Sequence, residues 1–403
     1  MNSNKLIPEL RFPKFKYEWK LKKFDFNFLQ TNTFSRSEMN NNKGSVKNIH
    51  YGDILIKYNN ILDDTSLIPF INEDINLNRF REESYLKNGD IIIADTAEDF
   101  SAGKAIEVQN IDCKVLSGQH TFLCRSEMKY APKYLGYYLN SPSYRKYLIK
   151  FLTGTKVYSI NKKNMKNTFI IYPKSLEEQH RIASFLTTAD ELIGAERRKL
   201  EALKKYKKGL MQKLFPRDGE KIPEMRFPEF QTSGEWEEKQ IKDVLTYERP
   251  DLYIVEDTNY LDNGIPVLTA NKSFILGYTD ETDNIYNNLP VIIFDDFTTD
   301  KKYVDFPFKV KSSAIKILKS KDGYVLKFIY ELLNIIYFNL KEHKRYYISM
   351  YQNLTILVPT LPEQQKIAEV LSTADELIGA ERRKLEALKK YKKGLMQKLF
   401  PNI

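Results

Sequence analysis

Two cysteines and one histidine form the pattern in this sequence that comes closest to a metal site. Cys113, His120 and Cys124 are spaced as Cys-x6-His-x3-Cys. A structural zinc ion usually takes four such ligands, and this pattern supplies three. Two cysteines in 403 residues also cannot form a disulfide framework, and free thiols are typical of a reducing compartment. We therefore expect no metal site and interpret both cysteines as ordinary buried side chains.

Candidates for catalysis are weak. Asp251, which follows Pro250, and the run Asp300-Lys301-Lys302 could together imitate a nuclease site, in which carboxylates hold a metal ion beside a lysine. They lie far apart in the chain, and charged loops at strand ends explain them equally well. The sequence has no G-x-x-x-x-G-K-[ST] loop for phosphates and no Asn-Pro-Pro or Asp-Pro-Pro motif of an amino-methyltransferase. We expect no catalytic residues in this chain.

An internal repeat determines the organisation of the chain. The segment TADELIGAERRKLEALKKYKKGLMQKLFP at 188–216 returns without a change at 373–401. A second repeat opens each half, IPELRFPKF at 7–15 and IPEMRFPEF at 222–230, and a tryptophan follows each copy. Between these shared ends the two halves show no comparable identity. The chain is therefore a duplicated frame that holds two different inserts.

The inserts are predicted to form mixed domains that are rich in strands. Short β-branched and aromatic runs alternate with Gly, Asn, Asp and Pro, which is typical of strands joined by turns. Helices are expected over 131–152 and 324–340, and a strand over 168–172. A length of 403 residues fits two or three domains.

Composition and charge narrow the function. No apolar run approaches the ~20 residues of a membrane span, and the first residues lack the features of a signal peptide, so we expect a cytoplasmic protein. The net charge of +10 favours an anionic partner, either nucleic acid or an acidic protein surface. Each copy of the 29-residue repeat has eight Lys or Arg and four Asp or Glu, so the two copies carry most of this charge. A solvated helix surface explains such charge equally well.

The repeated segment is predicted to form a long helix with an apolar seam. Its apolar residues recur every seven positions, and Glu196 and Lys207 interrupt them, as do their copies Glu381 and Lys392. An antiparallel pair can join Glu196 to Lys392 and Lys207 to Glu381, whereas a parallel pair would oppose like charges. We predict an intramolecular antiparallel coiled coil with pseudo-twofold symmetry; the alternative is that each helix packs only on its own domain. The predicted seam consists of Ala189, Ile193, Glu196, Leu200, Leu203, Lys207, Leu210, Leu214, Ala374, Ile378, Glu381, Leu385, Leu388, Lys392, Leu395 and Leu399.

The length of this pair suggests a ruler. The overlapping part, 189–214, would span ~39 Å, which is close to one turn of B-DNA at ~34 Å. A symmetric rod with a different domain at each end could read two dissimilar half-sites a fixed distance apart.

These features together resemble the specificity subunits of type I restriction-modification systems. The resemblance covers nearly the whole chain and rests on the alternation of variable domain and helix, on the related helix entries at 176–183 and 361–368, and on Thr-Ala-Asp-Glu-Leu at Thr188 and Thr373. It implies an α+β fold with two mixed, strand-rich target recognition domains separated by the two long helices of an antiparallel coiled coil. The implied domains are 1–175 and 217–360, and the implied spacer helices are 176–216 and 361–403.

The resemblance also implies the function. Each domain would recognise one half of an asymmetric, bipartite double-stranded DNA site, and the helices would set the spacer and dock two methyltransferase subunits, with two restriction subunits as possible further partners. Such complexes serve DNA methylation and host defence. This chain would need no cofactor, because S-adenosylmethionine, ATP and Mg belong to the partners. Two other classes remain open, a coiled-coil adaptor that binds only protein and a nucleic-acid-binding scaffold outside restriction.

Loops that correspond to the family's DNA contacts supply the candidate site. In the first domain they are 35–44, 48–53, 117–121 and 153–163; in the second they are 269–272, 298–302, 309–313 and 343–352. The loop 153–163 is the strongest, because Gly154 permits close backbone approach and its neighbours can bond phosphates or base edges, although a plain turn explains it too. Lys156, Lys302 and Lys311 are the favoured contacts. The full set is Ser35, Arg36, Lys43, His120, Thr153, Thr155, Lys156, Tyr158, Asn161, Lys162, Lys163, Asn271, Lys272, Thr298, Thr299, Lys301, Lys302, Lys309, Lys311, Ser312, His343, Lys344 and Arg345.

Overall fold

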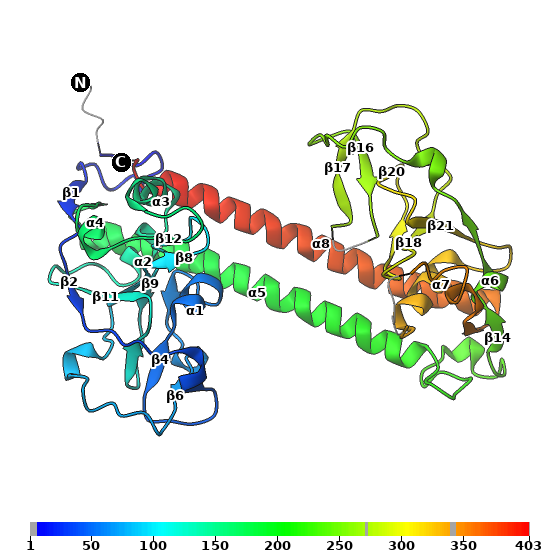
Figure 1. Cartoon of the computed structure of the whole chain (residues 1–403), viewed down its shortest axis with the longest axis horizontal. Helices are drawn as coiled ribbons and strands as arrows, with labels where there is room; N and C mark the ends of the chain where they lie inside the picture. Colours follow the sequence, from blue (N-terminus) through cyan, green and yellow to red (C-terminus); the bar gives the residue numbers. More distant parts are fainter. Residues whose placement is uncertain (1–5, 271–272, 339–343, 403) are drawn as a thin grey trace. The chain divides into compact units, whose positions relative to one another are not determined.

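The computed structural model describes residues 6–270, 273–338 and 344–402 (Figure 1). Three candidate DNA contacts, Asn271, Lys272 and His343, lie outside the described residues. The chain divides into two compact units: unit 1 comprises residues 1–196 and 384–403, and unit 2 comprises residues 197–383. Among the described residues, no helix combines the length and the apolar character needed to cross a membrane.

Unit 1 is built on a five-stranded sheet in the order β2-β11-β7-β9-β5, which is antiparallel except for the β5–β9 pair. A second sheet has the order β10-β4-β6-β3, and two small ribbons, β1-β13 and β8-β12, complete the unit. Its strands are β1 Lys20–Lys23, β2 Phe26–Leu29, β3 Met39–Asn40, β4 Lys47–Ile49, β5 Ile61–Leu62, β6 Phe70–Ile71, β7 Ile91–Ala94, β8 Thr96–Ala97, β9 Ala105–Val108, β10 Val115–Ser117, β11 Thr121–Ser126, β12 Tyr158–Ser159 and β13 Phe169–Tyr172.

The helices of unit 1 correct one expectation. The segment 131–152 is not one helix but three short ones, because Ser141 caps a new helix and Pro142 occupies its first turn. The helical elements before the long helix are η1 Arg36–Glu38, α1 Tyr51–Ile56, η2 Thr65–Leu67, η3 Glu82–Ser84, α2 Tyr134–Tyr138, α3 Pro142–Leu148, η4 Ile149–Phe151 and α4 Lys162–Lys166.

Unit 2 repeats this plan with fewer strands. Its main sheet has the order β15-β21-β18-β19, its second sheet has the order β17-β16-β20, and β14 pairs with β22. Its elements are η5 Pro228–Phe230, β14 Glu237–Gln240, α6 Ile241–Val244, β15 Leu245–Glu248, η6 Asp251–Tyr253, β16 Ile265–Leu268, β17 Ile275–Thr279, β18 Val291–Asp295, β19 Lys301–Val304, β20 Lys309–Val310, β21 Ile315–Ser320, α7 Leu326–Ile335, η7 Tyr351–Asn353 and β22 Thr355–Val358.

Two 39-residue helices, α5 Leu176–Leu214 and α8 Leu361–Leu399, contribute to both units (Figure 1). In unit 1 the start of α5 packs with the end of α8 in one core, which includes Leu186 and Leu399. In unit 2 the end of α5 packs with the start of α8, with Leu214 and Leu371 in the core. The helices therefore run antiparallel, as the seam predicts, and every predicted seam residue is buried or half-buried.

The register of the pair differs from the predicted one. Glu196 binds Lys384 rather than Lys392, and Lys392 binds Asp190. In unit 2, Lys199 takes the place predicted for Lys207 beside Glu381. The predicted pairings are therefore wrong by about one heptad, although opposite charges still meet in the seam.

The opening repeat explains the observed register, because it fastens both helices in each unit. Arg11 binds Glu178 at the start of α5, and the Leu10 amide donates to the Lys398 carbonyl at the end of α8. Unit 2 repeats these contacts with Arg226 and Glu363, and with Met225 and Lys213. These end contacts fix which residues of the two helices lie opposite each other, and the seam charges follow.

Candidate nucleic-acid interface

The first two candidate stretches of unit 1 meet at an ion pair. The Arg36 guanidinium donates to both carboxylate oxygens of Asp53, at 3.0 and 2.9 Å. Next to it, His50 caps α1 by accepting the Gly52 amide on Nδ1. Burial, and then the positive charge of Arg36, hold the pKa of His50 below its ordinary value. A neutral His50 therefore suits its role as acceptor in the cap.

The third stretch, 117–121, is attached to the second. The Gly118 amide donates to the Ile49 carbonyl at 2.8 Å, and a Cβ on Gly118 would lie 2.7 Å from that oxygen. His120, with φ at 54°, stacks edge-on against Tyr51 and lies 3.4 Å from an Asp95 carboxylate oxygen through Nδ1. About half of the His120 side chain is exposed, so it can still reach a ligand.

The fourth stretch is a tight loop with an exposed tip. Thr153 and Ser159 bond each other through their backbones, and Gly154 has a φ of +117° with no room for a Cβ against the Val157 carbonyl. This turn leaves Thr155 and Lys156 exposed. The other candidates have partners of their own: Asn161 caps α4, Tyr158 stacks on Phe100, and Lys162 lies over the Phe28 ring.

An aspartate that the sequence analysis missed joins the last two stretches. The Asp95 amide donates to the His120 carbonyl, and the Asp95 carbonyl accepts from the Ile160 amide. Burial raises the pKa of its carboxyl group, an effect that the neighbouring His120 opposes. Hydrogen bonds and one ion pair thus link all four stretches of unit 1, from Arg36 through His120 to the loop that carries Lys156.

Unit 2 has an aspartate at the same place. The Asp296 amide donates to the Ala314 carbonyl and its carbonyl accepts from the Tyr346 amide, both at 2.8 Å. Around it lies a cavity of about 360 Å³, lined by Arg249, Ser313 and Arg345 among others. A signal for Asp95 and Asp296 is present in the sequence, since each directly follows a buried strand that contains a run of apolar residues, β7 or β18.

The candidate basic residues of unit 2 differ in how far their side chains are exposed. Lys311, Lys344 and Arg345 are exposed, whereas Lys302 is half-buried. Burial lowers the pKa of Lys301 to about 8, and its Nζ lies 3.3 Å from the Tyr351 hydroxyl. Lys309 does not fit a DNA contact, because its side chain is 4% exposed and its charge is paired with Glu281. The physical reason is that the side chain of Lys309, in strand β20, is directed into the domain. The spacing of Lys309 and Lys311 in the sequence does not predict this orientation.

The remaining candidates differ in their contacts and in their exposure. Ser35 caps η1 together with Glu38, Lys43 pairs with Glu73, and Lys163 is exposed. In unit 2, Thr299 is buried with φ at 58°, Thr298 is exposed beside it, and the Ser312 hydroxyl accepts the Ala314 amide.

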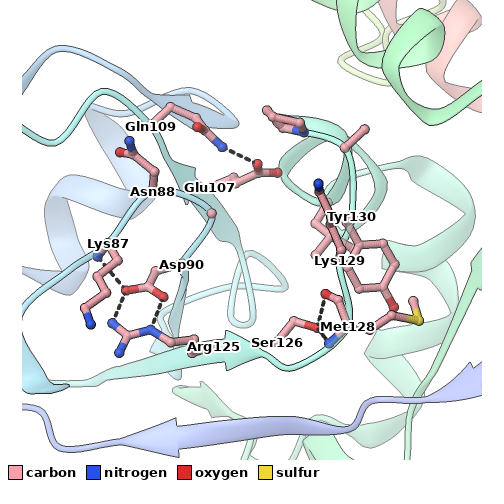
Figure 2. A pocket seen from close by; sticks show the side chains of 14 residues that line it. Lys87, Asn88, Asp90, Glu107, Gln109, Arg125, Ser126, Met128, Lys129 and Tyr130 are labelled. Carbon is pink, nitrogen blue, oxygen red and sulfur yellow. Dashed lines mark hydrogen bonds and ion pairs between the residues drawn. The ribbon is translucent and has the colours of Figure 1, made fainter. Parts of the chain in front are cut away.

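A cavity of about 380 Å³ on unit 1 is lined by two buried carboxylates that already have partners within the chain (Figure 2). Asp90 forms a two-pronged ion pair with Arg125, and Glu107 accepts the Lys133 and Gly136 amides at the start of α2. Burial raises the pKa of Glu107, although these amides oppose the effect. Glu107 thus helps to hold α2 in place.

Holding α2 matters because α2 docks on the long helices. Tyr137 of α2 donates its hydroxyl proton to Asp190, which also binds Lys392. In unit 2, Glu331 and Lys327 of α7 meet the repeat copies of these residues, Lys207 and Asp375, in a network of four charges. Each domain therefore contacts the same helix residues through side chains of its own, which the sequence analysis did not identify.

The duplicated domains, the polar loops and the shared antiparallel helices define a two-domain DNA specificity protein. The chain belongs to the family of type I restriction modification DNA specificity domains, whose family model matches residues 36–205 and 233–390. The resemblance found from the motifs is thereby confirmed.

Individual relatives agree with this family. Over 137 residues the chain is 46% identical to the Escherichia coli type I restriction enzyme EcoR124I/EcoR124II specificity subunit, a match that covers 32% of this chain and 34% of that protein. It is 26% identical over 337 residues, 77% of each chain, to a putative type I restriction enzyme MjaX specificity subunit of Methanocaldococcus jannaschii. The first match therefore spans only about a third of the length of that relative.

Solved structures support the fold. The S subunit of a type I restriction-modification system from M. genitalium superposes with a TM-score of 0.62 at 14% identity, and covers 98% of this chain and 100% of that chain. A chain from a study of assembly and conformational transition of the type I R-M system gives a TM-score of 0.51 at 16% identity, covering 95% and 97%. The α+β fold with duplicated domains and long helices is therefore confirmed.

Proposed function

We propose that this chain is the sequence-reading subunit of a type I restriction-modification complex. Unit 1 reads one half of a bipartite, asymmetric DNA site through the surface from Arg36 to Lys156, and unit 2 reads the other half through the loops around Asp296. One observation carries the proposal: two domains with different polar loops are built on one frame, whose two long helices share an identical 29-residue segment. Because the loops differ, the two half-sites differ.

The other roles in the complex belong to partners. The chain itself performs no chemistry; two methyltransferase subunits bind to it, and two restriction subunits can join. S-adenosylmethionine, ATP and Mg act in those subunits, and the complex acts on DNA in the cytoplasm. The basic helices and the two family domains support this arrangement over an adaptor that binds only protein.

Methylome sequencing of a host that expresses this chain with its neighbouring methyltransferase tests the proposal. We expect a methylated motif of two unequal parts with a fixed gap, and we expect its loss when this chain is omitted. A methyltransferase that is active but shows no motif dependent on this chain would favour the adaptor.

A further inference from the structure

Arg345 of unit 2 is an exposed arginine whose side chain is nevertheless held by two contacts. Its guanidinium lies over the Phe297 ring, 5.8 Å from the ring centroid, and donates to the Ser313 hydroxyl at 3.4 Å. A guanidinium has five N–H donors, and the contact with Ser313 uses one of them. Because the side chain is exposed, other donors can reach a ligand, and the two contacts limit the directions in which they point.

Asp296 fixes the backbone that carries Arg345. The Asp296 carbonyl accepts the Tyr346 amide, and its carboxylate Oδ1 accepts the Tyr347 amide, both at 2.8 Å. The Ser349 hydroxyl donates to the Arg345 carbonyl at 3.0 Å. Asp296 is 1% exposed, so its bonds are shielded from water. The segment around Arg345 is therefore attached firmly to the residue that follows β18.

The two partners of the guanidinium are fixed from the same place. Asp295, the last residue of β18, accepts the Phe297 amide on Oδ1 at 2.9 Å. The Asp296 amide donates to the carbonyl of Ala314, the residue after Ser313, at 2.8 Å. Two adjacent aspartates thus hold the backbone near the arginine and both of its side-chain partners.

The arginine lines the cavity of about 360 Å³ in unit 2. Arg345 and Ser313 come from two of the stretches that resemble DNA-contacting loops. Lys316 also lines the cavity; it is 4% exposed and pairs with Asp296 across 3.5 Å. Arg249 lines the cavity too and is exposed. The restrained arginine therefore lies at a basic hollow on the side of the domain where the candidate loops meet.

An arginine with a fixed orientation suits a base edge better than a phosphate. The planar fork of a guanidinium matches the two major-groove acceptors of guanine, O6 and N7, and this is the commonest specific contact between a side chain and a base. Such a contact needs one orientation of the fork, because it meets two acceptors at once. A phosphate is also bound well by a flexible lysine, which acts as a point charge. The restraints on Arg345 are thus those expected of a residue that reads a base.

We propose that Arg345 reads a guanine in the half-site of unit 2, and that Asp296 is the positioning residue that orients it. This inference rests on the proposed function and adds the base and the side chain that recognises it. It requires a G·C pair in that half-site. In unit 1, His120 lies beside the equivalent aspartate, Asp95, so the two units present different side chains at this place.

Affinity measurements on the complex of the full chain with its methyltransferase test the guanine contact. The motif found by methylome sequencing supplies the DNA, and 7-deazaguanine, which lacks the N7 acceptor, replaces each guanine of both strands in turn. We expect one replacement to weaken wild-type binding about fivefold to tenfold. R345A should bind the unmodified site about tenfold more weakly and should not respond to that replacement. R249A is the matched control, an exposed arginine of the same cavity, and should keep the full response.

R345K separates a base contact from a phosphate contact. It keeps the charge but loses the fork, so it should bind as weakly as R345A and should not respond to 7-deazaguanine. Binding restored by R345K would indicate a phosphate contact and overturn the proposal. A motif without a G·C pair in either half-site, or a loss in R345A that is coupled to no guanine, would overturn it too. A chain on which no methylated motif depends would instead refute the proposed function.

Two double variants test the role of Asp296. D296A/K316M removes the buried charge pair and also the acceptor of the Tyr347 amide, whereas D296N/K316M removes the same charges and keeps an oxygen acceptor. We expect the first to lose the response to 7-deazaguanine and the second to keep it. Their nonspecific DNA binding should be equal, because their net charges are equal and Arg345 is present in both. The same response in both variants would refute the positioning role.

Discussion

At the scale of single residues, chemical type and accessibility are separate properties. Lys156 and Lys309 are both lysines between strand-like runs, yet the first is exposed at a glycine turn and the second is enclosed and paired with Glu281. Sequence reasoning found the donor-rich loops because their residue types suit DNA. It could not find Lys309's burial, which depends on the sheet face that the residue occupies.

Replacing the two lysines should therefore have opposite consequences. K156A should weaken specific DNA binding and reduce the salt dependence of the affinity by about one phosphate contact. K309M should leave the DNA affinity of the folded protein unchanged and lower its free energy of unfolding by about 3 kcal/mol, because Glu281 loses its buried partner. Salt titrations of binding and urea unfolding measure the two effects. A stability loss in K156A with normal binding would remove that lysine from the interface.

At the scale of elements, the long helices were the most predictable part of the chain. A seven-residue rhythm and like charges at identical positions predicted both the helices and their antiparallel direction. The register was not predictable, because distant contacts such as Arg11–Glu178 and Leu10–Lys398 select it. The pair Ser141-Pro142 is typical of a helix start and could have predicted the break within 131–152. The apolar residues on either side instead suggested one continuous helix.

Charge reversal distinguishes the two registers. E196K should lower the free energy of unfolding by about 1–3 kcal/mol, since it places two lysines together beside the seam. Adding K384E should recover much of this loss, whereas adding K392E should not, because Lys392 binds Asp190. Denaturant unfolding of the single and double variants gives the coupling energies. Recovery by K392E instead would restore the register predicted from the seam.

At the scale of the whole molecule, the contacts of the opening repeat limit how the length of the helix pair can be changed. Because the opening repeat fastens both helices in each unit, lengthening one helix alone conflicts with these contacts. Matched seven-residue insertions after Glu196 and after Arg383 keep the seam in phase and add ~10 Å. The methylated motif should then keep both half-sites and gain about three base pairs between them at ~3.4 Å each. An unchanged gap would refute the ruler, and the single insertion serves as the destabilised control.

The division of each long helix between two units has a thermodynamic consequence. Neither unit can lose its core without releasing helix that completes the other, so unfolding should be one cooperative event. The chain carries its own reporters, because its two tryptophans, Trp19 and Trp236, are buried one in each unit. W19F and W236F would each leave one tryptophan, and the two melting curves followed by selective tryptophan excitation should coincide. The duplicated halves would then share one stability, so a mutation in either recognition domain would alter the melting of both.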